Sequence, residues 1–462
     1  MAQSDSLTAY VCEFITRTRA SAIPKDVMHL GKRSILDGIG LALAGNAAES
    51  GHIVRSYLRA LGIPIDKGCT VIGTNLKVPP RFAAFANGVA MHADDYDDTY
   101  HPTRFHPTAP VLSAVCAEAE QTGATGAAVL TAIAVGTEVS LKLSHTIDKQ
   151  HYLRGFHMTS TVGVFGATAG ACHIRKLSTE ATLAAIGIAG SESEGVRENF
   201  GTMVKPLHSG RAAENAVFAA SLAAMGFTSS PTILEGPRGY FMTGAGGYNA
   251  GELVGKLGNP WNYVAKRVAI KPYPCGNLQQ PAMDKLHEMV VENDIEPHQV
   301  ERLAVKSHRL MPLNLTYHRP VTGLEGKFSM EFSLASILVL RKAGLMEYSD
   351  EIVNRPDVQE AIRKIDYTVF TDEEAEKNGW HLWTTFLDIT LKDGRTLSAR
   401  VDEAKGSANQ PMTEDEVAEK FLDCAAFARM PTDRAKKAID LILDLEKVGD
   451  IRELTRLLAM GS

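Results

Sequence analysis

The chain has 462 residues, with 48 lysines and arginines against 54 aspartates and glutamates, and a formal net charge of −6. Acidic and basic residues are intermixed, so the sequence offers neither the basic face that nucleic acid requires nor a polybasic anchor for a membrane surface. These features favour a small-molecule partner. A chain of this length exceeds what one hydrophobic core usually organises, so we expect two domains.

The beginning of the chain and its cysteines predict a cytoplasmic protein. Residues 1–6 are polar and lead directly into an amphipathic pattern, without the basic and apolar regions of a signal peptide. We expect no membrane span, because no apolar run approaches the necessary length. The six cysteines lie far apart and form no Cys-x-x-Cys pair, which is typical of reduced thiols in a cytosolic protein.

Helical periodicity dominates the first part of the chain. Apolar residues recur there at intervals of three and four, and many of these segments are rich in alanine. Glycines within residues 37–45 predict close contact between helices, because glycine inside a helix otherwise costs about 1 kcal/mol relative to alanine. The predicted helices cover residues 7–20, 27–44, 81–93, 109–120, 124–143 and 212–225.

The pattern changes near Tyr263. Short apolar runs after this point predict strands, and Asp393 followed by Gly394 predicts the turn of a β-hairpin. Helical patterns return over residues 413–460, where we expect the chain to rejoin the first domain. The predicted strands cover residues 268–270, 303–305, 385–391 and 396–401, with helices at 282–291, 328–342 and 356–364.

The most unusual stretch, residues 91–107, lies at the end of a predicted helix. It contains four aspartates, three histidines and an arginine, and prolines follow His101 and His106. Clustered Asp and His side chains are common in catalytic and metal sites. If the helix continues through this stretch, Asp95 and Thr99 lie four residues apart on one face.

Two further polar islands occupy residues 154–161 and 199–211, and each precedes a segment of small residues. In the first island, Thr159 or Ser160 is expected to cap the next helix. Loops of a helical scaffold can converge on one pocket, where these islands would supply titratable and cationic groups for a carboxylate substrate. The side chains concerned are His106, His157, Lys205 and His208.

Three interpretations of the acidic stretch remain open. Asp94, Asp95 and Asp98 fit the D-D-x-x-D pattern by which helical terpenoid synthases hold magnesium and a diphosphate. An aromatic content of 7% and the lack of a second acidic motif count against this interpretation. The second interpretation is acid/base chemistry on an anionic substrate, with some aspartates orienting histidines. The third is a carboxylate-binding protein without catalysis, because a fold does not establish an activity.

Six short motifs follow one another along the chain: residues 36–40 (LDGIG), 92–99 (HADDYDDT), 155–157 (GFH), 205–208 (KPLH), 271–275 (KPYPC) and 323–329 (GLEGKFS). In this combination and order they resemble the MmgE/PrpD family, which includes 2-methylcitrate dehydratase, cis-aconitate decarboxylase and iminodisuccinate epimerase. The resemblance covers essentially the whole chain.

The resemblance implies a mainly α fold with an inserted α+β domain. A large helical domain would combine residues 1–265 and 403–462, and residues 266–402 would form a smaller lid domain. The resemblance also implies a homodimer and an active site in the cleft between the domains, which works without a cofactor or a metal.

The resemblance also implies roles for individual residues. Where the decarboxylase branch carries a histidine after the Lys-x-aromatic-Pro motif, this chain has Gln280, as dehydratase-like members can. We expect Lys205 and Arg104 to stabilise an enediolate-like intermediate, with His106 or His157 as base or acid. The predicted catalytic residues are His106, His157, Lys205 and Asp95, and the predicted substrate-binding residues are Thr99, Arg104, His208, Tyr317 and Gln280.

The sequence therefore predicts a lyase or isomerase that removes a proton α to a carboxylate of a small di- or tricarboxylic acid. The leading forms are dehydration of the 2-methylcitrate type and epimerisation of the iminodisuccinate type. Decarboxylation of the cis-aconitate type is the alternative within the same chemistry.

Overall fold

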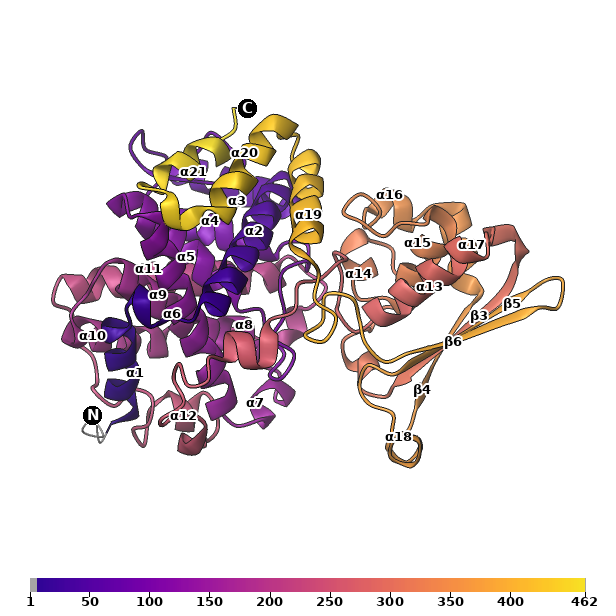
Figure 1. Cartoon of the computed structure of the whole chain (residues 1–462), viewed down its shortest axis with the longest axis horizontal. Helices are drawn as coiled ribbons and strands as arrows, with labels where there is room; N and C mark the ends of the chain where they lie inside the picture. Colours follow the sequence, from indigo (N-terminus) through magenta and orange to yellow (C-terminus); the bar gives the residue numbers. More distant parts are fainter. Residues whose placement is uncertain (1–5, 462) are drawn as a thin grey trace.

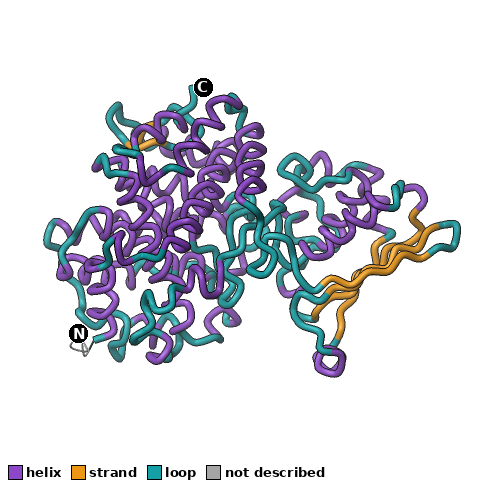
Figure 2. The backbone as a smooth tube through the Cα atoms, in the orientation of Figure 1, coloured by secondary structure: helices purple, strands orange, loops and turns teal. Residues whose placement is uncertain are grey.

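A computed structural model describes residues 6–461 of the chain. A larger lobe of helices and a smaller lobe lie side by side along the longest axis (Figure 1). Figure 2 shows that the long strands belong to the smaller lobe, while helices fill the larger one. The prediction of a mainly α fold with some β structure is confirmed.

Helices from both ends of the chain form the larger lobe. They are α1 (Leu7–Arg17), α2 (Lys25–Ala47), α3 (Glu49–Ala60), α4 (Pro80–His92), α5 (Thr108–Thr122), α6 (Gly126–Thr146), α7 (Gln150–Leu153), α8 (Met158–Thr161), α9 (Gly163–Ile174), α10 (Thr179–Ser191), α11 (Val204–Ala224), α12 (Tyr240–Thr243), α19 (Glu414–Phe427), α20 (Thr432–Leu443) and α21 (Arg452–Leu458), with the short strands β1 (Cys69–Thr70) and β2 (Lys77–Val78).

Helix α2 is central to this lobe. Ile35 and Ile39 of α2 share an apolar cluster with Phe421 of α19, so the two ends of the chain pack together. A Cβ on Gly45 would lie 1.9 Å from the carbonyl oxygen of Ala90, so this glycine permits the close contact between α2 and α4. The predicted close approach of helices at this motif is therefore confirmed.

The smaller lobe has its own apolar core, built from side chains between Tyr273 and Ala399. Its sheet has the order β4-β3-β5-β6, in which β3 and β4 run parallel and the other neighbours antiparallel. Helices α13, α15 and α17 cover one side of the sheet (Figure 1). The elements are α13 (Gln280–Glu292), β3 (Val300–His308), α14 (Gly323–Gly326), α15 (Met330–Leu340), α16 (Asp350–Val353), α17 (Pro356–Arg363), β4 (Ile365–Phe370), α18 (Asp372–Asn378), β5 (Thr385–Leu391) and β6 (Thr396–Val401).

The predicted hairpin and most predicted helices are confirmed, but the elements differ from the sequence prediction in three places. Residues 268–270 form no strand, and only Ala269 makes an isolated bridge, with Thr99. The helix expected from Ala212 begins earlier, at Val204, so the third polar island lies largely within α11. Strand β4 was not predicted, because its pairing with β3 is parallel and depends on residues far apart in the sequence.

Two features bear on the predicted compartment. Helix α6 is long and apolar enough to cross a membrane, contrary to the expectation from sequence, but 89% of its most apolar window is buried inside the larger lobe. Such burial is typical of a core helix in a soluble protein. All six cysteines are free, as predicted, and all six are buried.

Candidate active site

A pocket between the two lobes encloses about 780 Å³ of space, part of it open to solvent. Its two sides differ in composition, and we name each side by its residues. The ionisable wall consists of Asp95, Thr99, His101, Arg104, His106, Tyr152, His157, Phe200, Lys205 and Lys271. The uncharged wall, from the smaller lobe, consists of Gly276, Asn277, Leu278, Leu310, Asn314, Leu315, Phe328, Leu382 and Trp383.

Asp95 lies where α4 has already ended. The helix stops at His92, so the predicted continuation through Thr99 is wrong, although Asp95 and Thr99 both line the pocket. Asp95 has a φ of 50°, in the left-handed region that non-glycine residues rarely occupy. Its carboxylate Oδ1 lies 2.6 Å from the Lys205 Nζ and 3.0 Å from the Lys271 Nζ. Burial opposes ionisation of Asp95, but the two ammonium groups outweigh it and hold the pKa of this carboxyl below its usual range.

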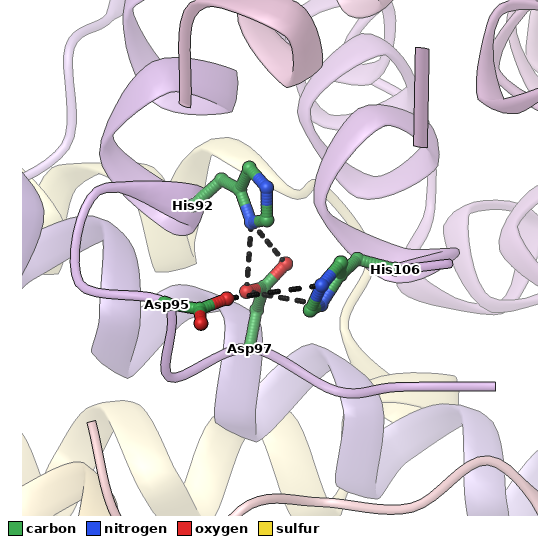
Figure 3. Close-up of side chains that lie close together, drawn as sticks. All are labelled: His92, Asp95, Asp97 and His106. Carbon is green, nitrogen blue, oxygen red and sulfur yellow. Dashed lines mark hydrogen bonds and ion pairs between the residues drawn. The ribbon is translucent and has the colours of Figure 1, made fainter. Parts of the chain in front are cut away.

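Figure 3 shows His92 and His106 on either side of the Asp97 carboxylate. The His92 Nδ1 lies 2.8 and 2.9 Å from the two carboxylate oxygens, so Nδ1 must carry the proton that it donates. The opposite nitrogen of His92, Nε2, then accepts a hydrogen bond from the Lys205 Nζ at 3.2 Å. Burial lowers the pKa of His92 to about 3, so the imidazole remains neutral at neutral pH.

The Lys205 ammonium is almost fully buried and has three protons to donate. Among the described residues, its hydrogen-bond acceptors are Asp95 and His92, which leaves one proton for a ligand in the pocket. The same ammonium lies 5.2 Å from the Phe200 ring and 5.8 Å from the Phe328 ring, where the two walls meet. Burial lowers the pKa of Lys205, while the charge of Asp95 opposes that shift.

The tautomer of His106 is fixed by its surroundings. Its Nδ1 donates to the backbone carbonyl oxygen of Asp98 at 2.8 Å and lies 3.3 Å from the Asp97 carboxylate. The Nε2 of the neutral ring therefore presents a lone pair toward the pocket, 3.8 Å from the Asp95 carboxylate. The backbone N–H of His106 donates to the Thr159 hydroxyl at 3.2 Å.

The hydrogen bond between the His106 N–H and the Thr159 hydroxyl differs from the predicted role of Thr159 as a helix cap. Helix α9 begins after Val162 without a side-chain cap, and α8 begins after His157, also without one. Neither Thr159 nor Ser160 caps a helix. Thr159 instead fixes the loop that carries His106, which connects the first and second polar islands directly.

His157 lines the pocket and pairs with His208, which lies behind it. Their Nδ1 atoms lie 3.0 Å apart, so one ring donates a proton and the other accepts it. The Nε2 of His157 is buried, has no hydrogen-bond partner among the described residues, and belongs to a side chain that lines the pocket. Burial lowers the pKa of His157 well below its usual range and that of His208 to about 4. Both rings are therefore neutral at neutral pH.

Two further predicted residues contribute polar groups to the ionisable wall. The Thr99 hydroxyl is buried and has no hydrogen-bond partner among the side chains and backbone groups that the structure describes. Its backbone exchanges two hydrogen bonds with Ala269, of 2.8 and 2.9 Å, which holds the threonine in place. Arg104 lines the pocket from a left-handed position with a φ of 63°, and its guanidinium carbon lies 5.6 Å from the Tyr152 ring.

Three predicted substrate-binding residues do not line the pocket. His208 lies behind His157. Tyr317 is half-buried beside Gly201, where an added Cβ would lie 2.6 Å from the phenol oxygen. The Gln280 side chain, at the start of α13, donates to the backbone carbonyl oxygens of Tyr273 and Cys275 in the preceding loop, at 3.3 and 3.4 Å.

Sequence reasoning assigned no role to Lys271, although its motif was one of those that carry the resemblance. Lys271 also donates to the backbone carbonyl oxygen of Asp95 at 2.7 Å, so it fixes both the charge and the backbone of that residue. His92 was missed as well, and its proximity in sequence to Asp97 was the available signal.

Lys420 of α19 connects the two loops that hold these groups. Its ammonium donates to the carbonyl oxygens of Tyr96 and Lys271, at 2.8 and 2.9 Å, and lies 2.6 Å from the Asp37 carboxylate of α2. Both side chains are buried. The pocket therefore depends on a residue near the end of the chain.

The carboxylates of the magnesium interpretation do not form one ion site. Asp94 pairs with Lys327 at 2.7 Å, and Asp98 accepts hydrogen bonds from Thr108. The potential metal ligands that lie within 4.8 Å of one another among the described residues are His92, Asp95, Asp97 and His106. In the structure these groups are engaged in hydrogen bonds: His92 with Asp97 and Lys205, and His106 with the Asp98 carbonyl oxygen.

Comparison with known proteins gives two family matches and several full-length relatives. Residues 9–252 match the MmgE/PrpD N-terminal domain, and residues 273–447 match the MmgE/PrpD C-terminal domain. The chain is 28% identical to human cis-aconitate decarboxylase, over 98% of this chain and 94% of the relative. It is 28% identical to the mouse cis-aconitate decarboxylase, over 98% and 93%, and 29% identical to that of Aspergillus terreus, over 98% and 96%.

Proposed function

The chain belongs to the MmgE/PrpD family, and from this premise we propose that it transfers a proton at the carbon α to a carboxylate of a small polycarboxylic acid. It is an enzyme of the lyase type, like its relatives. In our proposal it uses neither a cofactor nor a metal. The observation that carries the proposal is the position of the His106 lone pair and the Lys205 ammonium, both directed at the Asp95 side of one pocket.

The proposed reaction begins with the substrate carboxylates at the cationic groups Arg104, Lys205 and Lys271. His106 Nε2 takes the proton from the α carbon, and Asp97 stabilises the resulting imidazolium. Negative charge then develops on the carboxylate oxygens, where the remaining Lys205 proton and the Thr99 hydroxyl donate hydrogen bonds. Fixed donors aimed at developing charge lower the barrier, because they need little reorganisation.

The second step distinguishes the forms of the reaction. In dehydration, the carbon–oxygen bond breaks and the leaving hydroxide takes a proton from His157 to become water. In epimerisation, His157 returns a proton to the opposite face of the same carbon. His208 supports either step, since the proton shared between the two Nδ1 atoms can compensate the change at His157 Nε2.

Decarboxylation is the second candidate, and the names of the relatives favour it. There the carbon–carbon bond breaks, carbon dioxide leaves, and the electron pair remains on carbon until it takes a proton from His157. The ionisable wall suits all three reactions, because each develops negative charge beside the same carboxylate.

The test uses purified protein treated with EDTA and assayed in D₂O with methylcitrate, cis-aconitate, iminodisuccinate and alkyl-substituted succinates. We expect deuterium incorporation, water loss or carbon dioxide release, followed by NMR, with at least one substrate. Activity that appears only after magnesium is added, or no reaction with any substrate, overturns the proposal.

We also propose, from the resemblance, that residues 266–402 act as a lid between segments 1–265 and 403–462, and that the enzyme is a cytoplasmic homodimer. Contacts between Lys327 and Asp94 and between Trp383 and His101 support a closing role for the smaller lobe. Light scattering of the purified protein tests the dimer, and a mass equal to one chain overturns it.

A further inference from the structure

The two walls of the pocket differ in charge. On the uncharged wall, none of the described side chains is ionisable. Leu278, Leu315 and Phe328 are buried there, and Leu310, Leu382 and Trp383 are partly buried. A substrate group on this side meets mainly apolar carbon.

The ionisable wall carries enough charge for two carboxylates. Arg104, Lys205 and Lys271 are cationic, and Asp95 is the carboxylate among the lining residues. Burial lowers the pKa of His101 to about 4 and that of His157 further below its usual range, so both are neutral at neutral pH. In the proposed mechanism His106 is also neutral before it takes the proton. The excess of cationic groups over carboxylates is therefore two.

A third carboxylate would have no matching cation. The cations next to residues of the uncharged wall have other partners. The Arg197 guanidinium donates to the Asn314 side chain at 2.8 Å and to the Tyr152 carbonyl oxygen at 3.0 Å, Arg309 donates to Asp372, and Lys327 donates to Asp94. Arg197 does not line the pocket. A carboxylate placed against the leucines would lose its hydration without gaining a partner, which is strongly unfavourable. An alkyl group there gains about fourfold in affinity for each buried methylene.

We propose that the substrate is a dicarboxylate that bears an uncharged alkyl substituent. Its two carboxylates lie on the ionisable wall, and the alkyl group lies against Leu310, Leu382 and Trp383. This inference rests on the proposed function, and it narrows the substrate from polycarboxylic acids in general to this class.

The test compares ligands that share two carboxylates and differ only in the third substituent. An isobutyl group and a carboxymethyl group have nearly the same shape, but only the second is charged. The pairs are 2-isobutylmaleate with cis-aconitate, and 2-isobutylsuccinate with propane-1,2,3-tricarboxylate, each with maleate or succinate as the unsubstituted core. Binding is measured by calorimetry on the full chain.

We expect the isobutyl ligand to bind at least about tenfold tighter than its tricarboxylate partner in a series that binds. A smaller preference, or a preference for the tricarboxylate, overturns the inference and leaves the proposed function intact. If no ligand of either series binds and none is turned over, the proposed function fails together with the inference.

A pair of variants tests whether the lack of charge on the uncharged wall causes the preference for the isobutyl ligand. Leu310→Lys places an ammonium on the uncharged wall, while Leu310→Met has a similar length and no charge. The lysine variant is expected to reverse the preference within each ligand pair, and the methionine variant to keep it. Leu382→Lys repeats the test at a second position in case the first variant does not fold. A folded lysine variant at either position that keeps the wild-type preference overturns the inference.

Discussion

The ionisable wall and the uncharged wall of the pocket are held in different ways. On the first, each reactive side chain has partners that fix its proton or its charge, as with Lys205 between Asp95 and His92. On the second, the loops of the smaller lobe present side chains such as Leu310 and Leu382 without hydrogen bonds to make. The ionisable wall is therefore suited to proton transfer, and the uncharged wall to selecting substrates by their shape and polarity. Changes in the second wall can alter the substrate while the chemistry remains.

The largest effect is expected for Lys205→Met, which tests the role of the ionisable wall in proton transfer. Loss of the ammonium removes a donor to the developing charge and leaves Asp95 with one lysine, so kcat is expected to fall about a thousandfold. Steady-state kinetics give the value, and Lys142→Met is the matched control. Lys142 is a buried lysine that donates to the Pro260 carbonyl oxygen outside the pocket. Its replacement should reduce stability while kcat remains, and equal losses in the two variants would contradict the assignment.

The second test concerns the base. His106→Gln keeps a polar side chain but removes the titratable nitrogen, so we expect a loss in kcat of about a hundredfold or more. Exchange of the substrate α proton with D₂O should fall in parallel, because the same nitrogen takes that proton. A variant that retains normal exchange but loses product formation would assign His106 to the second step instead.

Substitutions on the uncharged wall should change KM rather than kcat. Leu382→Ala removes apolar contact that the substrate makes equally before and during the reaction, so KM is expected to rise about tenfold with little change in kcat. Initial-rate measurements over a wide substrate range separate the two constants. A fall in kcat of the same size as in the His106 variant would contradict the assignment of different roles to the two walls.

The smallest predicted effect is on the alkaline side of the pH profile. Burial lowers the pKa of Lys205 from 10.5, and the active form is the charged one, so activity is lost as pH rises through this lowered value. We expect kcat/KM to fall on the alkaline side of neutral pH, and at a lower pH than an unshifted lysine would cause. Lys205→Arg keeps its charge throughout, so its profile should be flat over this range at a lower rate. An identical alkaline fall in both proteins would assign the titration to another group.

Much of this arrangement could be predicted from local sequence. Alternation and periodicity gave the hairpin around Asp393 and Gly394 and the helices that pack the larger lobe. The polar islands pointed to side chains that the fold brings to one pocket, because acidic and histidine-rich segments inside an apolar scaffold have few other uses.

The remaining details depend on contacts between distant residues. Asp95 has a left-handed backbone, and lysines from two other segments hold its carboxylate. Lys205 lies in the first turn of α11, where Pro206 needs no hydrogen bond, although the sequence pattern predicted the helix only from Ala212. Gln280 was placed at the pocket by resemblance, but its backbone acceptors lie in a loop whose shape the sequence does not specify.

The ion pair between Asp37 and Lys420 has a consequence for the synthesis of the protein. A ribosome makes Asp37, Tyr96 and Lys271 long before Lys420, yet the ammonium of Lys420 ties all three together. The larger lobe therefore cannot complete its centre until α19 has been made, although the smaller lobe, with its own core, is already available to fold. A chain that ends before α19 contains every residue of the ionisable wall but lacks the helix whose Lys420 connects the loops of Tyr96 and Lys271.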